Sequence, residues 1–167
     1  MAEPRLLLAG IGNIFLGDDA FGVHVAQQLA AREWPPGVRV EDFGIRGFDL
    51  ACALVGGYSG AILIDATIRG GTPGTLYVIE PATTDATPRA IDPHTLDPVG
   101  VLRFACSLGS VCPWVRVVGC EPLTLGTDDD PATALSEPVA RATEEAVSLV
   151  ETLVGTFLDE SERAGGH

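Results

Sequence analysis

The sequence contains no lysine, and all ten of its basic residues are arginine. Lysine chemistry is therefore excluded: a Schiff base with a substrate carbonyl, a pyridoxal phosphate site, and the lysine-bearing loop that binds nucleotide phosphates. Basic side chains are also few overall, because 23 acidic residues give the 167-residue chain a net charge of −13. This charge disfavours nucleic acids and anionic membrane surfaces as partners, since both require clustered cations.

Long hydrophobic runs are missing as well. No apolar segment approaches the roughly 20 residues that span a bilayer, and the N-terminal MAEPRLLLAG favours a strand over a signal peptide. We therefore expect a cytoplasmic protein that does not bind membranes. The four cysteines show no Cys-x-x-Cys spacing, which favours reduced, mostly buried thiols over a zinc cluster or a disulfide framework.

Alternating apolar segments predict an α/β protein. The segments that favour strands are residues 5–10, 38–43, 60–66, 75–80 and 114–122. The segments that favour helices begin after Asp19, at residue 48, at residue 94 or 95, and near residue 139. This alternation predicts a three-layer α/β sandwich, with strand 75–80 antiparallel to its neighbour or elsewhere in the sheet. We expect one domain over residues 1–158 and a disordered tail over 159–167.

Two familiar kinds of site fit the sequence poorly. Gly10 and Gly12 suggest a dinucleotide-binding loop, but Phe15 stands where its third glycine belongs. The following helix also opens with two carboxylates, which would repel a pyrophosphate. No Gly-x-Ser-x-Gly motif is present, and no cysteine has a histidine at a catalytic spacing.

Acidic residues follow three successive predicted strands. Asp18 and Asp19 follow the first, Asp42 ends the second and Asp65 ends the third, while His94 follows a long loop. The carboxyl ends of parallel strands share one edge, so these side chains can meet there as N/O ligands for Zn, Ni, Co or Mn. Each also has a structural alternative: Asp18 or Asp19 as a helix cap, Asp42 on turn amides, Asp65 as a turn cap, and His94 at a helix start.

The same residues carry a family resemblance over residues 5–122. In order and spacing, GIGNIFLGDDAFGV, VRVEDFGIRGFDLA, AILIDA, DPHTLDPVGVL and VVGCEP resemble the maturation endopeptidases of nickel–iron hydrogenases. The resemblance implies a twisted, mostly parallel five-stranded sheet with helices on both faces, of the phosphorylase/hydrolase-like kind. It also implies an activity, removal of the C-terminal extension of the hydrogenase large-subunit precursor after nickel insertion.

The resemblance further implies roles for individual residues. Asp19, often Glu in relatives, together with Asp65 and His94 correspond to metal ligands, and Asp42 to an acid associated with activity. Nickel would be supplied by the precursor, although Zn or Cd could occupy the same ligands. Asp18 is expected to cap or support the following helix.

The second motif departs from the family pattern. It reads DFGIRG where relatives often have an acid, two glycines and a threonine, which implies a difference in substrate choice. We expect Gly44, Arg46 and Gly47 in this segment to contact the precursor near its cleavage point.

The role of the metal stays open at this level. It can serve to recognise a nickel-filled precursor, or it can polarise the scissile carbonyl or activate water, with Asp42 or another carboxylate as general base. A non-catalytic metal-binding maturation chaperone and a nucleotide-binding α/β protein are the alternatives. The hydrogenase that is processed, the cleavage sequence and the oligomeric state do not follow from the sequence.

Overall fold

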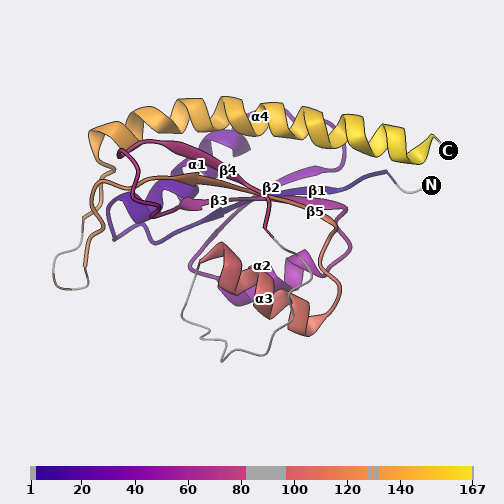
Figure 1. Ribbon diagram of the computed structural model, residues 1–167, viewed down its shortest axis with the longest axis horizontal. Helices are drawn as coiled ribbons and strands as arrows, with labels where there is room; N and C mark the ends of the chain where they lie inside the picture. Colours follow the sequence, from indigo (N-terminus) through magenta and orange to yellow (C-terminus); the bar gives the residue numbers. More distant parts are fainter. Residues whose placement is uncertain (1–2, 82–96, 128, 130–131, 167) are drawn as a thin grey trace.

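The computed structural model describes residues 3–81, 97–127, 129 and 132–166. Its sheet has five strands in the order β2-β1-β3-β5-β4 (Figure 1). The strands are β1 Leu6–Ile11, β2 Val38–Gly44, β3 Gly60–Ala66, β4 Leu76–Ile79 and β5 Trp114–Cys120. The helices are α1 Phe21–Ala30, α2 Gly47–Leu54, α3 Pro98–Leu108 and α4 Glu137–Gly165, and the 3₁₀ helix η1 spans Asp18–Ala20.

Helices cover both faces of the sheet, which confirms the predicted three-layer α/β sandwich. Side chains alternate along each strand, so Leu6 and Leu8 of β1 pack with α1 and α4, while Leu7 and Ala9 pack with α2 and α3. Figure 1 shows α1 and α4 on one side of the sheet and α2 and α3 on the other. The continuous apolar run of β3 follows from this burial on two faces.

Four strands are parallel, and β4 is the exception. β1 pairs in parallel with β2 and β3, and β3 pairs in parallel with β5. β4 lies at the edge beyond β5 and runs antiparallel to it. The short link after β3 cannot hold a crossover helix, so the chain passes the end of β5 and returns along its far side. Both alternatives proposed for strand 75–80 therefore hold: it is antiparallel to its neighbour and is not adjacent to β3.

The sheet has a topological switch point between β1 and β3. From β1 the chain passes through α1 to β2 on one side, and from β2 it returns through α2 to β3 on the other side of β1. The helices of these two crossovers lie on opposite faces of the sheet. In open α/β sheets, the carboxyl ends of the strands at such a point border the crevice in which ligands bind.

Helix α1 packs closely against this switch point because two glycines face each other. A Cβ on Gly22 of α1 would lie 2.0 Å from the carbonyl oxygen of Ile64 and 2.3 Å from that of Ile11. A Cβ on Gly10 of β1 would lie 2.4 Å from the Gly22 carbonyl oxygen. Only hydrogen fits at both positions, so the helix backbone rests directly on the two central strands.

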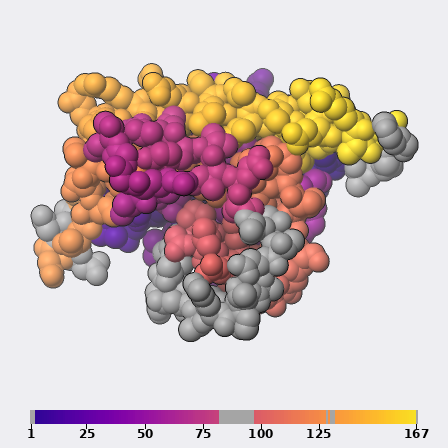
Figure 2. Space-filling view, viewed as in Figure 1, coloured from indigo at the N-terminus to yellow at the C-terminus, as the bar shows by residue number. Residues whose placement is uncertain are grey.

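Helix α4 runs through residues for which we predicted a disordered tail, and it ends at Gly165. Trp114 at the start of β5 holds this part of the helix. Its Nε1 donates a hydrogen bond of 2.8 Å to Glu160, and its ring packs edge-on against Phe157 at 5.2 Å. The prediction of disorder from residue 159 is wrong up to residue 165. The buried apolar side chains of α4 end at Phe157, but the contact between Glu160 and Trp114 lies beyond them. Figure 2 shows α4 as an orange-to-yellow band along one side of the molecule.

Two further outcomes concern helices. The helix expected from residue 94 or 95 begins at Pro98, and residues 82–96 lie outside the described part of the chain. Among the residues that the structure describes, no helix combines the length and apolar character needed to cross a bilayer.

Candidate functional site

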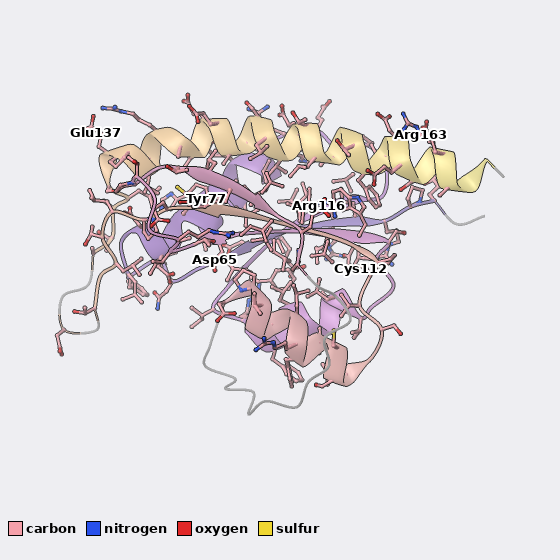
Figure 3. The ribbon with its side chains drawn as sticks, in the orientation of Figure 1. Asp65, Tyr77, Cys112, Arg116, Glu137 and Arg163 are labelled. Atoms are coloured by element: carbon pink, nitrogen blue, oxygen red, sulfur yellow. The ribbon has the colours of Figure 1, made fainter. Side chains whose placement is uncertain are left out.

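Asp19 and Asp65 lie on the two sides of the switch point. Asp19 is in η1, which follows β1, and Asp65 is the penultimate residue of β3. Asp65 follows the alternation of Ala61 and Leu63, so it belongs to the sheet face covered by α2 and α3. Figure 3 shows Asp65 near the end of the sheet that lies beside the start of α3. The structure therefore brings these two predicted ligands to one edge.

The surroundings of Asp65 disfavour its charged form. Burial raises the pKa of Asp65 well above its ordinary value, the negative charge of Asp19 raises it further, and that of Asp97 adds to the effect. One hydrogen bond opposes this shift, from the Ala66 backbone N–H to Oδ1 at 2.8 Å. The carboxyl of Asp65 thus lies in a place where a proton or a cation is favourable.

Asp19 is shifted in the same direction for a similar reason. Burial raises its pKa, and the N–H of Asn13, which donates to Oδ2 at 3.0 Å, partly offsets the rise. Because Asp19 and Asp65 repel one another and each accepts few hydrogen bonds, the pair is poorly compensated by the protein itself. Such uncompensated carboxylates at a crevice are candidates for a functional site.

Asp97 is a third acid of this site, and the sequence reasoning missed it. It caps α3 by accepting a hydrogen bond of 2.6 Å from the Gly100 N–H, and its negative charge acts on Asp65. An aspartate followed by proline before an apolar helical stripe indicates an N-cap, so the sequence did contain a signal for its structural role. His94 lies outside the described residues, three positions before Asp97 in the sequence.

Asp18 has a different role from Asp19, although the two are adjacent. Its buried carboxylate accepts hydrogen bonds from the N–H groups of Leu123 and Thr124, and from both the N–H and the hydroxyl of Ser136. Burial alone would raise the pKa of Asp18, but these four bonds lower it below its ordinary value. The prediction was that Asp18 caps or supports the following helix, and its first alternative is wrong, because neither η1 nor α1 has a side-chain cap. Asp18 instead joins the loop after β5 to the start of α4.

Replacing Asp18 by asparagine should lower the free energy of unfolding by about 2–4 kcal/mol, because the amide nitrogen cannot accept the donors that the lost oxygen served. The pKa of Asp18 is lowered in the folded state, so its contribution is present above the ordinary aspartate pKa and is lost as pH falls through the folded value. Urea titrations at neutral and acidic pH measure both effects. Asp19→Asn is the matched control. A variant at Asp18 as stable as the parent would contradict this role.

Asp42 lies at the same edge but in a different environment. It is exposed, and its Oδ1 accepts a hydrogen bond of 2.9 Å from the Gly44 N–H, as expected for a carboxylate that binds a turn amide. Val38 and Val40 pack on the side of α1 and α4, so the alternation of β2 assigns Asp42 to the sheet face opposite Asp65. β1 lies between β2 and β3, so Asp42 and Asp65 come from strands that flank it.

The predicted precursor-contact residues form the turn after β2. Gly44 has a φ of 53°, which favours glycine, and its carbonyl accepts from Gly12 N–H at 3.0 Å. Arg46 donates to the Asp42 carbonyl at 2.6 Å and forms ion pairs with Glu41 and Asp49. Its guanidinium thus supports the turn within the protein itself. Contact of Gly44, Arg46 and Gly47 with a precursor stays a prediction.

Within the described residues, no group of three His, Cys, Asp or Glu side chains is placed to hold a metal ion. Asp19 and Asp65 provide carboxylate oxygens, which are hard ligands, and the predicted third ligand His94 lies outside the described part. The two acids therefore fit a cation that brings other ligands with it better than one held by this protein alone.

The glycine-bearing loop does not fit a dinucleotide. A Cβ on Gly12 would lie 2.0 Å from the Asp19 carbonyl oxygen, so the glycine admits the protein's own backbone rather than a phosphate. The acids of η1 then occupy the position where a pyrophosphate would need donors. This geometry argues against the nucleotide-binding alternative.

The prediction of mostly buried thiols holds for two of the four cysteines, Cys112 and Cys120. Burial raises the pKa of Cys112 to about 11, and burial, followed by the charges of Asp18 and Glu121, raises that of Cys120 to about 12. Thiols with such pKa values are poor nucleophiles near neutral pH. Cys52 is exposed. Burial therefore argues against Cys112 and Cys120 as nucleophiles.

Glu121 is another acid whose role the sequence reasoning missed, and unlike Asp97 it is buried. It accepts hydrogen bonds from the N–H groups of Arg69 and Gly70 at 2.8 and 3.0 Å and from the Tyr77 hydroxyl at 3.0 Å. Burial alone would raise its pKa, but these bonds lower it below its ordinary value. Glu121 therefore holds the loop between β3 and β4 beside the site.

Comparison with known proteins decides the family. The family described as hydrogenase maturation protease matches residues 23–153. The chain belongs to this family. Membership in the hydrogenase maturation protease family supports an endopeptidase role in hydrogenase maturation. The predicted resemblance is thereby confirmed.

Individual members of the hydrogenase maturation protease family agree with this result. The chain is 32% identical over 154 residues to the hydrogenase expression/formation protein HupM of Azotobacter chroococcum, covering 89% of this chain and 70% of that protein. A hydrogenase 2 maturation peptidase from a Thaumarchaeota archaeon has 33% identity and a TM-score of 0.70, with 90% and 98% of the chains covered. The hydrogenase maturating endopeptidase HybD from E. coli has 28% identity and a TM-score of 0.75, with 91% and 93% covered.

Proposed function

We propose that the protein removes the C-terminal extension of a nickel–iron hydrogenase large-subunit precursor, and that Asp19, Asp65 and His94 recognise the nickel already bound in that precursor. The observation that carries the nickel part is the poorly compensated pair of Asp19 and Asp65 at the switch point. Burial raises the pKa of both carboxyls, and the charge of Asp19 raises that of Asp65 further, so a cation approaching with the substrate would stabilise their charged forms. Carboxylate and imidazole ligands suit a divalent ion such as nickel.

Nickel in this proposal belongs to the substrate and acts in docking. A precursor without nickel leaves the repulsion between Asp19 and Asp65 without a compensating cation, so it binds less well. A precursor with nickel places its metal against the two carboxylates and thereby positions the nearby peptide bond. The site would then discriminate filled from unfilled precursor before cleavage.

The hydrolytic step needs a group that accepts a proton from the attacking water and returns it to the leaving amine. We assign this role to Asp42, an exposed carboxylate at the same edge whose backbone is held by Arg46. Oxygen of the water forms the new bond to the scissile carbonyl carbon, the C–N bond breaks, and the proton passes through the carboxylate to nitrogen.

Incubation with nickel-loaded and nickel-free precursor, followed by mass measurement of the large subunit, tests the proposal. We expect loss of the extension only from the nickel-loaded precursor. Binding without any mass change would favour the non-catalytic maturation chaperone instead. Equal cleavage of both precursors would contradict nickel recognition while leaving the protease activity in place.

The Asp42→Asn variant should cleave nickel-loaded precursor about a hundredfold more slowly or worse, the usual cost of losing a general base. Binding of that precursor should be retained, because Asp42 is not part of the Asp19–Asp65 pair. Single-turnover cleavage and a separate binding titration measure the two effects. Asp49→Asn changes another exposed acid, in the first turn of α2, and serves as the control. Loss of precursor binding together with cleavage would place Asp42 among the recognition residues.

A further inference from the structure

Exposed apolar side chains gather at the edge that carries the site. We define the apolar rim as six side chains in the loops after the four parallel strands: Ile14, Phe15, Ile45, Ile68, Leu123 and Leu125. They account for six of the ten large apolar side chains that are exposed among the described residues, with Ile68 the most exposed at 72%. Scattered exposed apolar residues are ordinary, whereas a group at one edge indicates a surface that another molecule covers.

Backbone contacts join the loops of the apolar rim to one another. The Thr67 N–H donates to the Cys120 carbonyl at 2.8 Å, which joins the loop after β3 to the end of β5. Gly17 forms a β-bridge with Leu125, which joins the loop after β1 to the loop after β5. In Figure 2 the orange residues after β5 lie beside indigo residues near the start of the chain. The rim is therefore one surface, and it flanks Asp19 and Asp65.

The charged side chains of this edge are mostly acidic. Two arginines also lie there. Arg46 is engaged by Glu41 at 3.8 Å and by Asp49 at 3.3 Å. The guanidinium of Arg69 lies over the Tyr77 ring, 5.4 Å from its centroid. Asp19 and Asp65 contribute further negative charge. A covering segment with acidic residues would be repelled, so charge complementarity favours a segment that is apolar and poor in acids.

We propose that the apolar rim binds an apolar, acid-poor segment of the large-subunit precursor that lies next to the bond to be cut. The inference rests on the proposed function, since a precursor whose nickel meets Asp19 and Asp65 must cross this edge. Apolar contact with the rim then provides most of the affinity, and Asp19 and Asp65 distinguish a precursor that carries nickel from one that does not. The rim thus forms the outer part of the same recognition surface.

Variants with a charge on the rim test this inference against matched controls. Ile68→Glu and Leu123→Glu add a charge to the rim, whereas Val78→Glu and Leu108→Glu add one at exposed apolar positions outside it. We expect the rim variants to raise KM and the dissociation constant for nickel-loaded precursor by about tenfold or more, with kcat little changed. The outside variants and Ile68→Leu should behave as the parent. Melting temperatures establish that all variants are folded.

The outcomes separate the rim from the activity itself. If the parent cleaves the precursor and the rim variants retain its KM and dissociation constant, the rim inference is overturned and the proposed function stands. If the parent neither binds nor cleaves any hydrogenase precursor, both are overturned. If the outside variants weaken binding as much as the rim variants, added charge alone explains the effect and the rim inference is wrong.

Discussion

Asp65→Asn should reduce processing of nickel-loaded precursor about a hundredfold or more. Loss of a residue that only hydrogen-bonds to a metal ligand usually costs about 10–100-fold in affinity or activity, and loss of the ligand itself should cost at least as much. The same change should raise the thermal stability of the free protein. Asn keeps the Oδ1 acceptor for the Ala66 N–H but removes a charge that burial and Asp19 both disfavour. The variant is therefore expected to be more stable and inactive.

The stability gain should depend on pH in a defined direction. The pKa of Asp65 is raised in the folded state, so protonated Asp65 contributes stability at low pH that is lost as pH rises through the ordinary value towards the folded one. Asparagine does not titrate, so the melting-temperature difference between variant and parent should be larger at about pH 8 than at about pH 4. Asp159→Asn, a change of an exposed acid on α4, should show no such trend.

Both readouts are needed for this prediction. Calorimetry across the pH range measures the stability, and mass measurement of the precursor measures processing. Normal processing by Asp65→Asn would remove this residue from the proposed recognition site. A variant that is less stable than the parent at neutral pH would show that its carboxylate is compensated.

Gly22→Ala should lower the free energy of unfolding by about 4 kcal/mol or more, which is a large part of the stability of an ordinary domain. The added methyl would meet two backbone carbonyls, of Ile64 and Ile11, that belong to central strands and cannot rotate away. Relief requires α1 to move off the sheet, and that movement would open the core formed by Phe21 and its neighbours.

Gly155→Ala provides the matched control, because it is also a helical glycine and nothing lies within 4 Å of a Cβ added there. This substitution should leave stability unchanged or raise it by about 0.5–1 kcal/mol, the usual difference between glycine and alanine in a helix. Urea unfolding of both variants makes the comparison. Equal stability of the two alanine variants would show that α1 can shift without cost.

The sheet was predictable from local patterns because its strands are short and either continuously apolar or bounded by turns. The apolar run ending at Asp65 predicted a central strand, and the short link after it required the next strand to lie elsewhere or antiparallel. Neither pattern contains the strand order, which depends on which faces the crossover helices cover. The end of α4 was missed because Trp114, far away in the sequence, holds it.

The site was predictable only in part. Strand-end positions indicated Asp19 and Asp65, since parallel strands share one edge, but the roles of two adjacent aspartates cannot be separated without their partners. Asp18 binds donors more than 100 residues away. The Asp97-Pro98 pair indicates a helix N-cap, and this local pattern gives no hint that the charge of Asp97 also raises the pKa of Asp65. The assignment of His94 as a ligand stays a prediction.

Asp18 and Asp19 are adjacent in the sequence but differ in their contacts, so replacing one should not have the effect of replacing the other. The carboxylate of Asp18 accepts four hydrogen bonds within the fold, whereas that of Asp19 is assigned to the substrate in the proposed function, so the two positions serve different ends. A variant that lacks Asp19 keeps the hydrogen bonds by which Asp18 joins η1 to the loop after β5 and to the start of α4. It is therefore expected to fold, with an altered binding edge. In the proposed function, a single substitution at Asp19 would thus change the binding edge of a folded scaffold, whereas loss of Asp18 would weaken the scaffold itself.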